Sequence, residues 1–150
     1  MAASTDSERI RVLEDIEAIK KLKVKYWHCI DRKLWDELAT CFAEDGVLVA
    51  QEQNIDIRGG NAISNMLKER LEKSSILTIH QGHNPNIEIA TDTTAKGTWT
   101  LQDYARDSEI KRGTRGWALY EDEYVKEDGK WKIKRTQVSR IHTERFKWDS

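Results

Sequence analysis

Apolar residues recur every three or four positions over 9–30, which is the spacing of an amphipathic helix with one buried face. The opposite face is rich in lysine and glutamate, a pattern more typical of a solvated surface than of a binding patch. A second, shorter helix is predicted over 33–43 and ends before an Asp-Gly pair. A third is predicted over 61–71, with Asn61 as its N-cap.

The second half of the chain alternates polar and apolar residues, and turn-forming residues separate the alternating runs. Asp128-Gly129 is a strong hairpin signal between the last two runs. Helices followed by antiparallel strands predict an α+β fold in which the helices cover a strongly curved sheet and enclose a pocket. The predicted strands lie near 47–50, 75–82, 85–91, 94–105, 114–127 and 131–143.

Composition narrows the class of protein. The chain has 150 residues, a single proline and no repeat, so we expect one domain over 1–150 with a frayed polar end at 1–8. Its 25 Lys and Arg residues against 26 Asp and Glu residues argue against nucleic acid or an anionic membrane as a partner. Cys29 and Cys41 lie in predicted helices without a preceding secretory signal, which favours two buried, reduced thiols and a cytoplasmic protein.

Strand alternation shows which polar residues occupy apolar positions. Asp103 continues the inner face of Ala95, Gly97, Trp99 and Leu101, so its carboxylate needs a partner unless the strand ends before it. Asp31 closes the first helix, where the helix dipole disfavours a carboxylate. N-capping of the second helix explains Asp31 equally well.

Two histidines form an H-x-x-H spacing, but strand alternation points His80 and His83 to opposite faces, which argues against a shared metal ion. His80 follows an apolar run and enters the predicted core. It is either a hydrogen-bonded core histidine or a general base oriented by a carboxylate such as Asp31. Arg140 falls on the outer face of the last strand, unless a bulge shifts the register.

Aromatic residues are plentiful for so polar a chain, with six tryptophans. Trp99, Trp117 and Trp131 are predicted on the inner face of the sheet, whereas Trp27 and Trp35 belong to the helices that cover it. These rings would form both core and pocket wall, which suits a flat apolar ligand.

Several separated segments together resemble the SnoaL-like branch of the nuclear-transport-factor-2-like superfamily, most closely its bile acid 7-alpha-dehydratases and more distantly scytalone dehydratase and lindane dehydrochlorinase. The resemblance runs from Asp15 to Phe146. It is carried by Asp15-Ile-Glu-Ala-Ile-Lys-Lys-Leu-Lys-Val-Lys-Tyr26, Lys33-Leu-Trp-Asp-Glu-Leu38, Ile79-His-Gln-Gly-His83, Thr94-Ala-Lys-Gly-Thr-Trp99, Asp128-Gly-Lys-Trp131 and Arg140-Ile141.

The resemblance implies a cone-shaped barrel with a pocket open at one end, no cofactor, a homotrimer and elimination chemistry on an apolar small molecule. It places catalytic roles on Tyr26, Asp31, His80, Asp103 and Arg140, and it implies a bulge that turns Arg140 inward. Substrate contacts are expected from Trp99, Leu101, Trp117, Tyr120 and His83.

The expected reaction is dehydration of a hydroxylated, carbonyl-activated alicyclic compound such as a steroid or bile-acid intermediate. Isomerisation, cyclisation or dehydrohalogenation by the same His-Asp pair, or ligand binding without catalysis, are the alternatives. The segment 106–113 and the strand 47–52 depart from the family pattern near the expected pocket rim, so the reaction class can carry over without the substrate.

Overall fold

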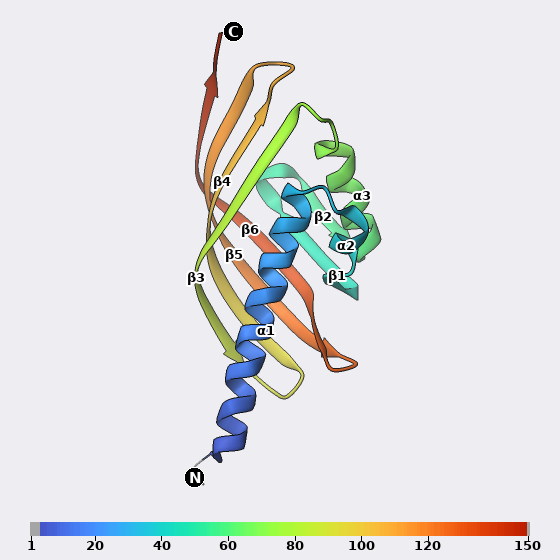
Figure 1. The fold of residues 1–150 in the computed structure, drawn as a ribbon, viewed down its shortest axis with the longest axis vertical. Coiled ribbons are helices and arrows are strands. Elements are labelled where there is room, and N and C mark those ends of the chain that lie inside the picture. The colour runs from blue at the N-terminus through green and yellow to red at the C-terminus, as the bar shows by residue number, and fades with distance from the viewer. Residues whose placement is uncertain (1–3, 150) are drawn as a thin grey trace.

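The computed structural model describes residues 4–149, in which helices cover the concave side of a long curved sheet (Figure 1). The strand order is β2-β1-β6-β5-β4-β3, and every neighbouring pair is antiparallel except β1 with β6. This confirms the predicted α+β fold. In chain order the described elements are α1 (Asp6–Asp31), α2 (Trp35–Ala39), β1 (Phe42–Ala50), the 3-10 turn η1 (Gln51–Gln53), β2 (Ile55–Arg58), α3 (Gly60–Leu71), β3 (Ile76–Ile89), β4 (Thr94–Asp107), β5 (Arg112–Glu127) and β6 (Lys130–Lys147).

The first helix starts earlier than its periodicity predicts. Thr5 and Glu8 form a capping box, in which the Glu8 amide donates to Thr5 Oγ1 at 3.2 Å and the Thr5 amide donates to Glu8 Oε2 at 2.8 Å. The prediction of a frayed end is therefore wrong for residues 6–8, which are helical, while residues 1–3 lie outside the described part of the chain.

The second helix is shorter than predicted, because the chain enters β1 at Phe42. The Ile133 amide donates to the Cys41 carbonyl at 2.8 Å, and Phe42 is paired with Ile133 of β6. Phe42 still packs in the core, with its ring edge-on to Tyr26 at 5.9 Å. Pairing with a strand some ninety residues away is invisible to local periodicity, so the helical spacing extended the prediction too far.

The start of α3 is set by glycine and not by Asn61, whose predicted capping role is wrong. Gly59 occupies the N-cap position with φ of +94°, a conformation that glycine adopts without strain. A side chain at Gly60 would clash with the Ala39 carbonyl. The short β2, which the sequence did not predict, pairs with β1 just before this start.

A single strand, β3, replaces the two predicted over 75–82 and 85–91. Its pairing with β4 is irregular between His83 and Asn86, so a local bulge takes up the residues that resembled a turn. As expected, the side chains of His80 and His83 lie on opposite faces of the sheet: His80 is half-buried on the inner face, and His83 is exposed on the outer face.

Two one-residue register shifts divide β6. Lys134 lies at the shift opposite Glu123 and Tyr124, and Ile141 lies at the shift opposite Trp117 and Ala118. Between them, Thr136, Val138 and Arg140 face the helices. The inner face predicted from Trp131 to Ile141 therefore holds only as far as Ile133, and a bulge of the kind that Arg140 required is present at Lys134.

A polar cluster lies inside the core. The Lys23 ammonium, fully buried, is 2.8 Å from Asp122 Oδ2 and lies over the ring of Tyr120, 3.9 Å from its centroid. Tyr124 donates to the same carboxylate at 2.7 Å and accepts from the Trp99 indole at 3.0 Å. Cys29 and Cys41 are free, buried thiols, as the sequence predicted.

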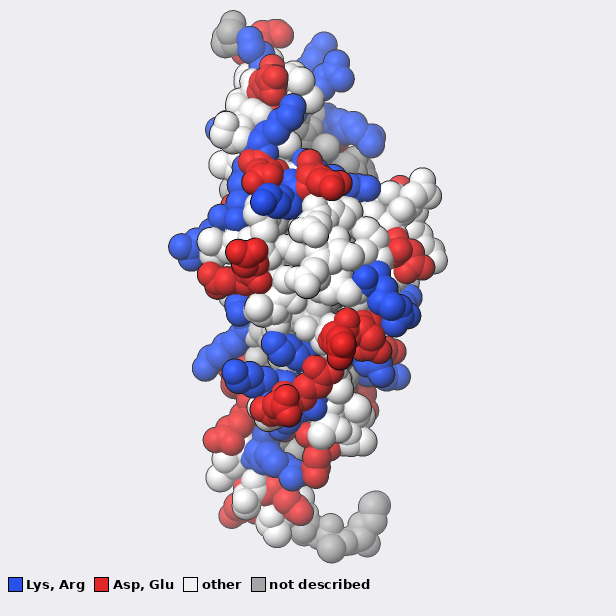
Figure 2. Space-filling model, turned by 90° about the vertical axis from the view of Figure 1, so that its right-hand side faces the viewer, with Lys and Arg blue, Asp and Glu red and all other residues white. Residues whose placement is uncertain are grey.

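Charges of both signs are interspersed on the face shown in Figure 2, around an uncharged central zone. This face therefore carries no extended region of one sign, in keeping with a net charge of −1. Among the helices of residues 4–149, none combines the length and the apolar character needed to cross a membrane.

Candidate active site

A cavity of about 500 Å³ opens between the concave face of the sheet and the ends of α1 and α3. Two tyrosines, both almost fully buried, form its deep end, and exposed residues of η1 and β6 together with the half-buried Thr114 of β5 form its mouth. Its apolar wall consists of Ile30, Leu48, Ala50, Ile55, Leu67, Leu71, Ala105 and Val138. The volume and the predominantly apolar wall are those of a small-molecule site.

His80 and Asp31 meet at one side of the cavity. Asp31 ends α1 and accepts three hydrogen bonds from β3: from His80 Nδ1 at 2.6 Å, from the His80 amide at 2.8 Å and from the Thr78 hydroxyl at 2.9 Å. The Lys33 ammonium, just beyond α1, donates to the Ile76 carbonyl at 3.0 Å and so ties the start of β3 to this helix end. A carboxylate held in this way fixes the imidazole tautomer, because Nδ1 must carry the proton, and Nε2 is left to accept one.

Tyr26 and Tyr120 form the deep end, with ring centroids 6.4 Å apart. Burial raises the pKa of Tyr26 well above its ordinary value of 10.0, and it raises the pKa of Tyr120 to about 12. Both phenols are therefore protonated at neutral pH, and their O–H groups can donate to a negative charge that develops in the cavity.

Asp103 and Arg140 close the polar side of the cavity with a bidentate ion pair. Arg140 Nη1 and Nη2 donate to the two carboxylate oxygens at 2.8 and 2.7 Å. The hydrogen bond to Asp103 raises the pKa of Arg140 despite its partial burial, so the guanidinium is always charged. The pair passes over Gly116, where any Cβ would clash with both Asp103 Oδ1 and Arg140 Nη1.

Five of the ten expected site residues line the cavity, a sixth, Asp31, is hydrogen-bonded to one of them, and four do neither. Trp99 and Leu101 are buried in the core beneath it, and Trp117 is on the outer face of the sheet, stacked on His142 with centroids 5.7 Å apart. His83 is exposed on the outer face as well. Substrate contact through these four side chains, and an inward position for Trp117, are wrong for this cavity. The lining residues are Tyr26, His80, Asp103, Tyr120 and Arg140, and Asp31 supports the site through its hydrogen bond to His80.

Thr78 and Gly116 are site residues that sequence reasoning missed. Thr78 has the same strand phase as His80, so alternation could have found it. Gly116 gave no signal, because its importance comes from two side chains that reach across it from neighbouring strands. Within residues 4–149, no group of three or more His, Cys, Asp or Glu side chains is placed to hold a metal ion.

A curved, mainly antiparallel sheet encloses an apolar cavity that holds a His-Asp pair and an Arg-Asp pair, an arrangement that places the chain among small α+β proteins with one binding pocket. The chain belongs to the SnoaL-like domain family, whose model matches residues 11–137. This confirms the family expected from the sequence, within the nuclear-transport-factor-2-like fold.

Solved structures share this fold over nearly the whole chain. A putative scytalone dehydratase from Novosphingobium aromaticivorans is 24% identical, with a TM-score of 0.82 over 95% of this chain and 94% of its own. A type 2 hexachlorocyclohexane dehydrochlorinase, LinA, is 19% identical, with a TM-score of 0.83 over 92% and 93%. ActVI-ORFA from Streptomyces coelicolor is 16% identical, with a TM-score of 0.72 over 84% and 96%. Identities this low establish a common fold.

Proposed function

We propose that the protein is a cofactor-independent dehydratase that removes water from a hydroxylated, carbonyl-activated alicyclic substrate, with a steroid or bile-acid intermediate as the first candidate. The observation that carries the proposal is the hydrogen bond of 2.6 Å between His80 Nδ1 and Asp31, on the wall of an apolar cavity. This arrangement gives His80 Nε2 the properties of a general base, because Asp31 stabilises the imidazolium that proton abstraction produces.

In the proposed mechanism, His80 Nε2 takes a proton from the carbon made acidic by the carbonyl system. The C–H electron pair moves toward the carbonyl oxygen, and the Tyr26 hydroxyl donates a hydrogen bond to the oxyanion that forms. The electrons return to form the new C=C bond as the C–O bond to the leaving hydroxyl breaks. The proton held by His80 joins the departing hydroxide, so the net loss is one water molecule.

Asp103 and Arg140 orient the polar end of the substrate in this mechanism. Their charges neutralise one another across two short hydrogen bonds, and the outer edge of the guanidinium can still donate to a substrate oxygen. Removal of either partner would leave an uncompensated charge at the cavity wall, which is costly.

The test is turnover of a panel of hydroxylated 3-oxo-4-ene steroids, followed by ultraviolet absorbance of the extended dienone and by loss of water in mass spectra. His80→Ala and Asp31→Ala should fold and lower kcat by a factor on the order of 10³. His83→Ala is the matched control, since it removes an exposed imidazole on the opposite face of the same strand. Normal turnover by His80→Ala would overturn the mechanism, and no product across the panel would exclude these steroids.

Dehydrohalogenation is the second candidate, favoured by the fold shared with a hexachlorocyclohexane dehydrochlorinase. The same proton abstraction serves it, with chloride as the leaving group in place of hydroxide. Chloride release from chlorinated cyclohexanes distinguishes it from dehydration, and product analysis likewise identifies isomerisation or cyclisation. Binding of a panel compound without any conversion would indicate a ligand-binding module.

A further inference from the structure

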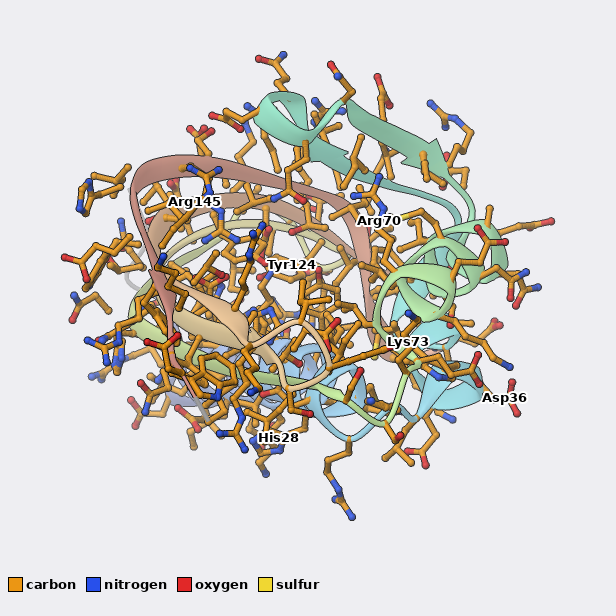
Figure 3. All side chains as sticks on the ribbon, turned by 90° about the horizontal axis from the view of Figure 1, so that it is seen from above. His28, Asp36, Arg70, Lys73, Tyr124 and Arg145 are labelled. Atoms are coloured by element: carbon orange, nitrogen blue, oxygen red, sulfur yellow. The ribbon has the colours of Figure 1, made fainter. Side chains whose placement is uncertain are left out.

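Three hydrogen-bond donors gather at the mouth of the cavity, away from the His80 side. They are the Thr114 hydroxyl of β5 and the Thr143 hydroxyl and Arg145 guanidinium of β6. None of the three side chains has a hydrogen-bond or ion-pair partner among residues 4–149, whereas the deeper Arg140 has both guanidinium arms occupied by Asp103. In the view from above, Arg145 lies on the inner side of β6 (Figure 3).

Strand pairing explains why these donors converge. Arg145 is paired with Thr114, and Thr143 with Gly116, so the three side chains occupy neighbouring positions on one face of two hydrogen-bonded strands. Ala105, paired with Thr114, is small and leaves space beside the guanidinium, whereas the Asp103–Arg140 pair fills the space over Gly116. A planar guanidinium flanked by two hydroxyls matches the geometry of an oxyanion such as a carboxylate.

The position of this group sets the length of the ligand. The sheet order places His80 on β3 and Arg145 on β6, three strand spacings apart, which is about 14 Å between backbones. Arg145 lies one inward-facing position further toward the mouth, since the row Thr78–Ala105–Thr114–Arg145 follows the row of His80. Both side chains reach inward, so a fused or linked ring system of about 10 Å would span them.

Of the two arginines that line the cavity, Arg140 is paired with Asp103 and Arg145 has no carboxylate partner among residues 4–149, so an anion would bind at Arg145. Glu52 is the acidic group of η1 that lines this end of the cavity, and its Oε1 accepts from the Arg140 amide at 3.3 Å. That hydrogen bond holds Glu52 next to Arg140, on one side of the mouth. Leu67 and Leu71 of α3 contribute an apolar wall.

We propose that Arg145, assisted by Thr114 and Thr143, binds a carboxylate at the end of the substrate remote from His80. The preferred substrates are then apolar ring systems that carry an acidic side chain about 10 Å from the reacting carbon. This inference rests on the proposed function, which places the reacting carbon at His80.

The experiment measures equilibrium binding of ring ligands in matched pairs, a 3-oxo-4-ene steroid with a side-chain carboxylate and its methyl ester. The unsubstituted protein should bind the carboxylate at least about tenfold more tightly. Arg145→Gln should abolish that preference while the Kd of the ester changes less than about threefold. Thr114→Val should weaken only the carboxylate, by a smaller factor.

Lys147→Gln is the matched control, since it removes one positive charge from the same strand at a residue that does not line the cavity. It should retain the carboxylate preference, also at 0.5 M salt, where diffuse surface attraction is screened. The inference is overturned if no carboxylate in the set binds more tightly than its ester. It is equally overturned if Arg145→Gln weakens both ligands alike, or if Lys147→Gln has the same effect.

Binding of the pairs to His80→Ala keeps the two proposals separate. If His80→Ala retains turnover, the proposed mechanism fails, yet the carboxylate preference remains measurable. If His80→Ala binds without turnover and Arg145→Gln leaves the preference unchanged, the dehydratase proposal stands and the carboxylate subsite does not.

Discussion

Gly116 has no side chain, and the ion pair between Asp103 and Arg140 depends on that. A Cβ at this position would clash with a carboxylate oxygen of one partner and a guanidinium nitrogen of the other. The two hydrogen bonds that hold Arg140 at the cavity wall therefore have their present geometry because glycine lies between the partners, and any larger residue would displace one of them.

Gly116→Ala should accordingly separate the pair. We expect kcat on the proposed substrates to fall at least about tenfold, and the free energy of unfolding to fall by about 1–3 kcal/mol, because two partly buried charges lose their partners. Steady-state kinetics and urea denaturation measure the two effects. Gly97→Ala is the control, since its added Cβ meets Tyr124 Cε2 at 3.1 Å and Ile87 Cγ1 at 3.4 Å but neither member of the ion pair. Wild-type kinetics in Gly116→Ala would show that the pair is dispensable.

At the same scale, the sequence identified the site residues whose neighbours are local. Asp103 was found from its strand phase, and Asp31 from its unfavourable place at a helix end. Arg140 was beyond alternation, because the bulge at Lys134 decides which side chains of β6 face inward there. Trp117 was within its reach, since β4 and β5 pair without a shift and its partner Gln102 belongs to the outer face. Family resemblance supplied the inward position of Arg140, but it did not correct Trp117.

The N-terminus of α1 is defined by one side-chain interaction, the capping box of Thr5 and Glu8. Thr5→Ala removes the acceptor of the Glu8 amide and should lower the free energy of unfolding by about 0.5–2 kcal/mol. The urea midpoint measures this loss, and Ser4→Ala, outside the helix, should leave it unchanged. Equal midpoints for the two variants would mean that the capping box adds nothing to stability.

Helices and strands that follow from the spacing of apolar residues were predicted well, and those that depend on pairing with distant strands were predicted poorly. The long helix and the strands β4 and β5 followed from spacing alone. The short β2 escaped, because its four residues form a strand only through pairing with β1. The predicted break in β3 was wrong because pairing with β4 carries the strand through the irregularity after His83.

On the scale of the whole molecule, buried tyrosines make stability depend on alkaline pH. Burial raises the pKa of Tyr26 and Tyr124 well above 10.0 and that of Tyr120 to about 12. In the unfolded chain these phenols ionise near pH 10, so above that pH the native state binds more protons than the unfolded state. Their contribution is complete below pH 10 and is lost as pH rises toward the native pKa values.

Each of the three should remove about 1.4 kcal/mol of unfolding free energy per pH unit above pH 10, or about 4 kcal/mol together. Lys23 opposes this, since burial lowers its pKa and its contribution rises with pH, but only up to the ordinary lysine value of 10.5. Urea denaturation at pH 9, 10 and 11 measures the slope, which Tyr120→Phe should reduce by about a third. A flat profile from pH 10 to 11 would contradict the prediction.

The two bulges of β6 give the strand a property that concerns insertions and deletions more than substitutions. Lys134 and Ile141 are single extra residues, and each one exchanges inward and outward positions for everything beyond it. Loss of the codon for Ile141 would close the bulge and leave Thr143 and Arg145 on the inner face, since His142 would follow Arg140 directly in regular pairing with β5. One residue inserted after His142 would instead turn both side chains to the outer face, so a comparison of such chains must count bulges before it compares residues.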